Sequence, residues 1–326
     1  MINTETNYAG LRLKNPLIIG SSGLTNNAAR NREFEKAGVA AIVLKSLFEE
    51  QIEMQCDKLL QSSSNIPEAA DYIRNYAKAH QVDQYISLIK ETKAHCSIPV
   101  IASINCYKSD AWIEFAHQVQ EAGADALELN VFYLCTELNF SFDSVIQLYT
   151  SVIQNIKAHI SIPIIIKLGK YFSNIPALVN MLKFQGADGV VLFNRYYQPD
   201  IDINSMQLVS GQVFSSHSDL SDTLRWTALV SGTVPGISIA SSSGIHDWED
   251  VIKCMVAGAD AVQLCSTVYT HGAEVFSQML TCIEEWMHQA KYESLSEIKG
   301  KMSFSNAENA SFYERSQFMK YFSDRD

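Results

Sequence analysis

A short motif recurs four times along the chain and constrains its fold more than any other feature. In each copy a helical pattern ends at a glycine, and a run of apolar residues follows at once. Glycine suits the residue after a helix because that position often needs a positive φ. A helix followed by a strand therefore repeats along the chain. The copies are Ala37-Gly38-Val39-Ala40, Ala122-Gly123-Ala124-Asp125, Gly186-Ala187-Asp188-Gly189 and Ala257-Gly258-Ala259-Asp260.

Four more apolar runs follow a proline, which is tolerated at the first residue of a strand. The prolines are Pro16, Pro99, Pro163 and Pro235. The resulting strands span 16–22, 40–45, 99–105, 126–131, 163–168, 189–194, 236–242 and 261–266. Helical patterns span 26–37, 81–95, 109–122, 141–159, 173–185, 221–231, 246–257 and 268–290. Because the apolar runs are continuous rather than alternating, they favour parallel strands covered on both faces.

Eight strands alternating with eight helices predict an α/β chain that folds as a (β/α)₈ TIM barrel. We expect one domain over residues 1–326, with a C-terminal tail at 291–326. An open doubly wound sheet is the alternative, but its usual G-x-G-x-x-G spacing is missing after the first strand. Long connections at 47–80, with a helix from Pro67, and at 195–220 follow the second and sixth strands. Both are expected to lie over the mouth of a barrel.

Composition excludes several classes of partner. The net charge of −11, without a run of Lys or Arg, disfavours nucleic acid. No apolar segment approaches the roughly 20 residues that cross a bilayer, and the start of the chain shows no signal segment. The seven cysteines form no C-x-x-C pair, which predicts free thiols in a reducing compartment. We expect a cytoplasmic protein that acts on a small molecule and holds no metal, because the histidines lack ligand spacing.

Polar residues stand where the predicted strands end, which is where barrel enzymes place their sites. The last two strands end in small residues, Ser241 to Gly244 and Cys265 to Thr267, each before a helix. Such helix starts suit a phosphate, because free N–H groups and the helix dipole favour an anion. The other strand ends carry Ser21, Ser22, Lys45, Ser46, Asn105, Asn130, Lys167 and Asn194.

The order of several short runs resembles the dihydroorotate dehydrogenase family over nearly the whole chain. These runs are N-P-L-I-I-G-S-S-G-L, A-I-V-L-K-S, E-L-N, I-K-L, F-N, the serine–glycine turn and Q-L-C-S-T. The resemblance implies a barrel that holds flavin mononucleotide (FMN) at its mouth. It also implies oxidation of dihydroorotate to orotate in pyrimidine biosynthesis, with a hydride passing to the flavin. Soluble members work as homodimers or with an iron–sulfur partner, and we expect a homodimer here.

The resemblance assigns roles to individual residues. Lys45 would contact both flavin and substrate, Lys167 would lie beside the flavin ring, and Asn130 and Asn194 would bind substrate. The implied cofactor-binding residues are Ser21, Ser22, Lys45, Ser46, Asn105, Asn130, Lys167, Ser242, Ser243, Gly244, Cys265 and Ser266.

The sequence departs from the family pattern on the substrate side. Tyr133 stands where the family has a Cys or Ser base, and Cys135 follows two residues later as a possible substitute. The family's N-S-M-G-L-P-N stretch is replaced by Gln61 to Pro67, and serines replace glycines in the phosphate turn. These changes leave open a flavin barrel acting on another cyclic amide or enone, or one that binds flavin or phosphate without turnover. Arg195, Tyr196 and Tyr197 lie on a mouth loop and are further candidates for the acid–base partner of such a substrate. Arg195, just after the sixth strand, could also hold a carboxylate or phosphate bidentately.

Overall fold

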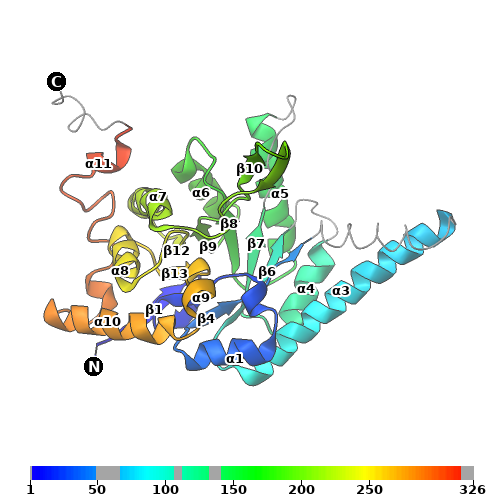
Figure 1. Cartoon of the computed structure of the whole chain (residues 1–326), viewed down its shortest axis with the longest axis horizontal. Coiled ribbons are helices and arrows are strands. Elements are labelled where there is room, and N and C mark those ends of the chain that lie inside the picture. The colour runs from blue at the N-terminus through cyan, green and yellow to red at the C-terminus, as the bar shows by residue number, and fades with distance from the viewer. Residues whose placement is uncertain (1, 49–66, 106–111, 132–140, 317–326) are drawn as a thin grey trace.

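A closed ring of parallel strands forms the centre of the molecule (Figure 1). The computed structural model describes residues 2–48, 67–105, 112–131 and 141–316. The ring closes because β3 pairs with both β13 and β4, and β4 pairs in turn with β6. The strands are β3 (Leu17–Ile19), β4 (Ala41–Val43), β6 (Val100–Asn105), β7 (Ala126–Asn130), β8 (Ile164–Leu168), β9 (Gly189–Leu192), β12 (Ser238–Ser242) and β13 (Ala261–Leu264). The predicted (β/α)₈ barrel is confirmed.

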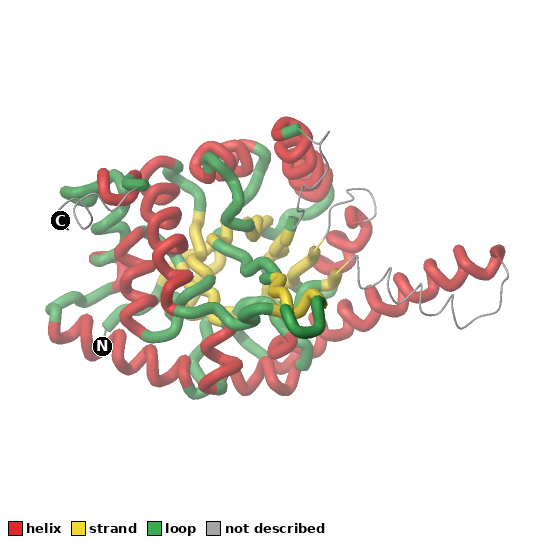
Figure 2. The backbone as a smooth tube through the Cα atoms, turned by 45° about the horizontal axis from the view of Figure 1, so that its top comes forward, coloured by secondary structure: helices red, strands yellow, loops and turns green. Residues whose placement is uncertain are grey.

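Helices surround this ring on its outer face, as Figure 2 shows. They are α1 (Ala28–Lys36), α3 (Pro67–His95), α4 (Ile113–Glu121), α5 (Phe142–Lys157), α6 (Ile175–Phe184), α7 (Leu220–Thr233), α8 (Trp248–Ala257) and α10 (Val275–Gln289). Two helices differ from the sequence prediction. The helix expected at 81–95 is the second half of α3, which begins at Pro67 and extends beyond the barrel (Figure 1). The helix expected at 268–290 is two helices, α9 (Ser266–His271) and α10, separated at Gly272 with φ 76°.

An N-terminal hairpin, which the sequence did not predict, closes the amino-terminal end of the barrel. Its strands β1 (Thr6–Tyr8) and β2 (Leu11–Leu13) pair antiparallel. The side chains of Tyr8 and Leu13 are fully buried, and they join the apolar residues that fill the barrel interior. A second, larger apolar cluster lies between the strands and the helices.

The recurring aspartate of the Gly-Ala-Asp motif has a structural role at this same end of the barrel. Each of the three carboxylates accepts a hydrogen bond from the N–H group at or next to the start of the preceding barrel strand, and each also meets a lysine. Each motif therefore ties two neighbouring strands together, beyond ending a helix. The pairs are Asp125 with Val100, Asp188 with Ile164, and Asp260 with Ile239, at 2.7–2.8 Å.

Two segments outside the barrel repeat take defined positions. The connection after β9 forms a hairpin of β10 (Pro199–Asp202) and β11 (Gln207–Ser210). A short strand, β5 (Leu47–Phe48), continues the second barrel strand beside β6. After α10 the tail runs back over α8 and α7, where Gly300 N–H donates to Met255 O and Phe304 N–H to Ala228 O.

We predict that replacing the aspartate of one motif destabilises the barrel. Asp188→Ala removes the bond to the Ile164 N–H and the 2.7 Å contact with Lys157 Nζ. We expect a loss of about 1–2 kcal/mol in the free energy of unfolding, measured by denaturant titration. The control is Glu284→Ala, which removes an exposed carboxylate from α10 and should change stability little. Equal losses in the two variants would contradict this role for the aspartate.

Candidate functional site

The carboxyl ends of the barrel strands surround two adjoining cavities. The first, here called the serine cavity, has a volume of about 420 Å³ and is bounded by Ser242–Gly244, Cys265 and Ser266. The second, here called the asparagine cavity, has a volume of about 330 Å³ and is bounded by residues of the first four strands. Four residues line both cavities: Ser21, Lys167, Asn194 and Arg195.

Every described member of the predicted cofactor and substrate set lines one of these cavities. Ser22, Lys45, Ser46, Asn105 and Asn130 line the asparagine cavity, together with the shared residues. The structure thus brings together side chains that are up to 245 positions apart, from Ser21 to Ser266. Tyr133 and Cys135, the candidate bases, lie outside the described residues. The individual roles in binding and catalysis stay predictions.

The turn after β12, which lines the serine cavity, has an unusual backbone conformation. Ser243 and Gly244 both adopt positive φ, 80° and 82°. Thr223 Oγ1 lies 3.0 Å from the carbonyl oxygens of both Ser242 and Ser243, and Ser243 Oγ donates to Phe193 O at 3.2 Å. These contacts compensate for the left-handed conformation of a serine, which costs about 1–2 kcal/mol.

Gly244 is required in this turn by two separate constraints. Its positive φ favours glycine, and a Cβ at this position would lie 2.1 Å from the backbone nitrogen of Leu220. The start of α7 therefore packs directly against the turn. Gly244 and Ile245 both line the serine cavity, and none of the hydrogen bonds between described residues uses the N–H group of either residue.

A loop from the connection after β9 covers the serine cavity. Phe214 stacks on Tyr269 with ring centroids 5.4 Å apart, and the Ser215 N–H donates to Ser266 Oγ at 3.0 Å. Arg195 holds the loop, because its three guanidinium nitrogens donate to Val213 O, Gln212 O and Asp219 Oδ2. The sequence offered Arg195 as a clamp for a carboxylate or phosphate. The structure instead uses its guanidinium within its own loop.

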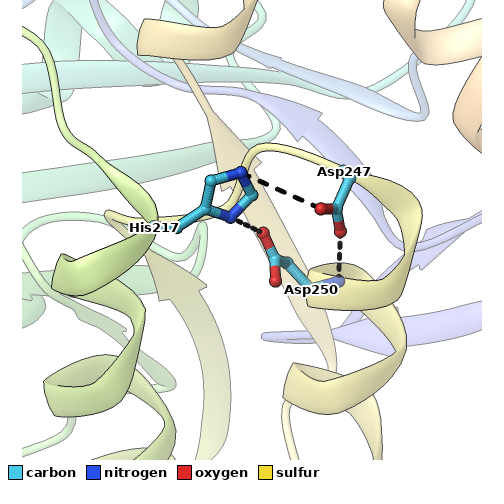
Figure 3. A group of neighbouring side chains, drawn as sticks. All are labelled: His217, Asp247 and Asp250. Atoms are coloured by element: carbon cyan, nitrogen blue, oxygen red, sulfur yellow. Dashed lines mark hydrogen bonds and ion pairs between the residues drawn. The ribbon is translucent and has the colours of Figure 1, made fainter.

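Behind this loop lies a cluster formed by His217, Asp247 and Asp250 (Figure 3). His217 Nδ1 lies 3.0 Å from Asp250 Oδ2, and its Nε2 lies 3.9 Å from Asp247 Oδ2. The other Asp250 oxygen accepts from Lys253 Nζ at 2.9 Å. Burial raises the pKa of Asp250, but hydrogen bonds from Lys253 and the His246 N–H outweigh it and hold that pKa below its ordinary value. The cluster is best described as side-chain contacts that fasten the loop to α8.

The His246 ring contacts both the loop and the start of α9. Its ring nitrogens lie 3.3 Å from Ser215 Oγ and 3.2 Å from Thr267 Oγ1. Burial, together with the neighbouring His217, lowers its pKa. Its ring therefore connects the covering loop to the start of α9.

Beneath the junction of the two cavities runs a buried polar network that the sequence analysis missed. The Lys167 ammonium donates to Gln263 Oε1 at 3.1 Å, and Gln263 Nε2 donates to Glu128 Oε2 at 2.6 Å. Glu128 also accepts from Ser103 Oγ at 3.4 Å. The signal was present in the sequence, because polar residues interrupt the apolar runs A-L-E-L-N and A-V-Q-L-C. Glu128 lies two residues before Asn130, and therefore on the same face of β7.

Two further contacts define the chemistry of the mouth. Asn194 Nδ2 donates to Asn130 Oδ1 at 3.0 Å, which joins the two residues predicted to bind substrate. Burial raises the pKa of Cys265, so this residue contributes a neutral thiol. The described cysteines Cys96, Cys254, Cys265 and Cys282 form no disulfides.

The barrel with a polar mouth on its carboxyl side defines the class of protein as a barrel enzyme. Residues 3–287 match the family model of dihydroorotate dehydrogenase. The chain therefore belongs to the dihydroorotate dehydrogenase family, and it is an oxidoreductase. None of the described helices combines the length and apolarity needed to cross a membrane.

Three relatives show how far the similarity extends, and each is named dihydroorotate dehydrogenase B (NAD(+)), catalytic subunit. The relative from Thermoplasma volcanium is 26% identical over 92% of this chain and 98% of its own length. The relative from Methanosarcina acetivorans is 28% identical over 90% and 94%. The relative from Pyrococcus abyssi is 27% identical over 91% and 98%. The similarity is distant but covers both chains almost completely.

We predict that Gly244→Ala disrupts the serine cavity more than its backbone conformation alone requires. Gly10→Ala is the matched control, because Gly10 has the same φ of +82° but nothing within 4 Å of an added Cβ. The control should lose about 1 kcal/mol in the free energy of unfolding. Gly244→Ala should lose a further 1–3 kcal/mol or so, because α7 must shift. Equal losses, measured by denaturant unfolding, would contradict the packing of α7 against the turn.

Proposed function

We propose that this protein is an FMN-dependent oxidoreductase that oxidises dihydroorotate to orotate. The observation that carries the proposal is the position of Lys167, a cationic side chain only 7% exposed that lines both cavities at their junction. The names of the relatives support the substrate, and the match to the family model supports the reaction class.

The residues of the two cavities fit FMN in their chemistry. The serine cavity combines the Gly244 and Ile245 N–H groups with the hydroxyls of Ser243 and Ser266, which suits a phosphate. At the junction, Ser21 is small enough to let a flat ring approach Lys167. Volumes of about 420 and 330 Å³ lie in the range of small-molecule sites.

In this assignment FMN, when bound, supplies the acceptor for the substrate's hydride. With FMN bound, the Lys167 ammonium would stabilise negative charge on the flavin by preorganised electrostatics. The bond between the two asparagines uses Asn194 Nδ2 and Asn130 Oδ1, so a ligand on this pair meets Asn194 Oδ1 and Asn130 Nδ2. One acceptor and one donor complement the N–H and C=O groups of a cyclic amide.

The base that removes the substrate proton is proposed from the sequence alone. Tyr133 stands at the position of the family base, and Tyr133 Oη would have to lose its own proton before accepting one. An ordinary tyrosine has a pKa near 10, so a base at neutral pH needs a nearby cation. Lys45, which lines the asparagine cavity, is the residue proposed to supply that charge.

We predict that Tyr133→Phe lowers turnover of dihydroorotate by about 10²–10⁴-fold, as expected for loss of a general base. Bound FMN should be unchanged in amount, because the ring remains. Turnover is measured from the anaerobic loss of flavin absorbance. Cys135→Ala, which removes the thiol, is the companion variant and should retain native turnover. If Cys135→Ala loses turnover and Tyr133→Phe does not, the base is Cys135. Native turnover in both variants would exclude Tyr133 and Cys135 as the base.

The altered substrate side favours one second candidate, an FMN barrel enzyme acting on a different cyclic amide or enone. The observation behind it is that this sequence replaces both the family base and the family's N-S-M-G-L-P-N stretch. Gln61 to Pro67 stand in place of that stretch. Reduction of the bound flavin by such a compound, but not by dihydroorotate, would select this candidate. The homodimer expected from the resemblance stays a prediction, and the relatives are named catalytic subunits.

A further inference from the structure

The buried carboxylate of Glu128 is a charged group of the site that the proposed chemistry does not use. Glu128 is 0% exposed, and its Oε1 lies 3.6 Å from the Lys167 ammonium. Gln263, 3% exposed, bridges the two charges, since it accepts from Lys167 and donates to Glu128. Lys167 is therefore half of a buried ion pair whose other half lies away from the cavities.

A chain of hydroxyl groups connects this carboxylate to the mouth. Ser103 Oγ donates to Glu128, and it lies 2.7 Å from Ser46 Oγ, which lies 2.9 Å from Ser21 Oγ. A carboxylate only accepts, so the Ser103 proton points toward Glu128 and Ser103 accepts from Ser46. Tyr85 holds the backbone of Ser103 in place, because the Tyr85 hydroxyl accepts a hydrogen bond from the Ser103 N–H at 2.7 Å. The carboxylate is thus held in one position by partners from three barrel strands, β6, β8 and β13.

We propose that Glu128 is a positioning residue that places the Lys167 ammonium at the junction of the cavities and partly neutralises its charge, and so sets the reduction potential of the bound flavin. This inference rests on the proposed function, because it concerns bound FMN. A bare ammonium in a buried site would favour reduced, anionic flavin strongly, and would also bind other anions. The adjacent Glu128 carboxylate weakens that preference. It also holds the ammonium in place through the Gln263 side-chain amide, which bonds to both groups.

The proposal predicts the sign of a shift in potential. Glu128→Gln removes the negative charge, so reduced FMN binds more tightly relative to oxidised FMN. A tenfold change in the ratio of the two affinities corresponds to about +30 mV for a two-electron couple. We expect a positive shift of at least this size. Lys167→Met should shift the potential in the opposite direction, because it removes the cation and leaves the carboxylate.

Exchanging the two buried side chains provides a matched control. The double variant Glu128→Gln, Gln263→Glu keeps the volume, the net charge and the pairing of one amide with one carboxylate. Its carboxylate stands where Gln263 Oε1 now lies, 3.1 Å from Lys167 Nζ, instead of 3.6 Å. The potential should return to the native value or below it. A double variant with the same potential as Glu128→Gln would overturn the proposal, as would an unshifted potential in Glu128→Gln.

A readout without flavin separates this inference from the proposed function. In the apoprotein, Glu128→Gln leaves Lys167 buried without its counter-charge, so it should unfold at lower denaturant than the Glu128→Gln, Lys167→Met double variant. If the two substitutions change the free energy of unfolding additively, Glu128 and Lys167 are not energetically coupled, and the ion pair would be overturned. Protein that shows this coupling but does not bind FMN would refute the proposed function and the flavin potential assigned to Glu128, while leaving the pair itself established.

Discussion

Closure of the sheet between β4 and β6 is the constraint on which the rest of this structure depends. It turns parallel strands into a ring, so that all their carboxyl ends meet around one opening. Residues far apart in sequence, such as Lys45, Asn130 and Ser266, then line adjoining cavities. The hairpin around Tyr8 fills the opposite end with apolar side chains, and the motif aspartates tie the strands together there. The apolar hairpin and the motif aspartates thus lie at one end of the barrel, and the two cavities lie at the other.

The fold was largely predictable because its signal is repeated. A glycine that ends a helix and an apolar run that follows are local features, and each copy supports the others. The N-terminal hairpin was missed because three-residue strands leave too short a pattern. The extra turns of α3 and the break at Gly272 are boundary details, which depend on tertiary packing as much as on local sequence.

The site was predictable where polar residues end a strand, and only in part where they lie inside one. Asn130 and Asn194 stand at the ends of apolar runs and were identified from that position, whereas Lys167, inside β8, was identified from its charge and from the family resemblance. Glu128 and Gln263 are surrounded by apolar neighbours in sequence, and only the barrel shows that they meet across its interior. The sequence also could not show that Arg195 is engaged by its own loop, because its three acceptors come from residues 17 to 24 positions later.

The central claim is that the two cavities hold FMN and that dihydroorotate reduces it. The most direct test is the visible spectrum of the purified protein, recorded before and after anaerobic addition of dihydroorotate. We predict a yellow protein whose flavin absorbance disappears on addition. Protein that stays colourless after reconstitution with FMN would contradict the cofactor assignment. Yellow protein that dihydroorotate does not bleach would contradict the substrate while leaving the flavin barrel in place.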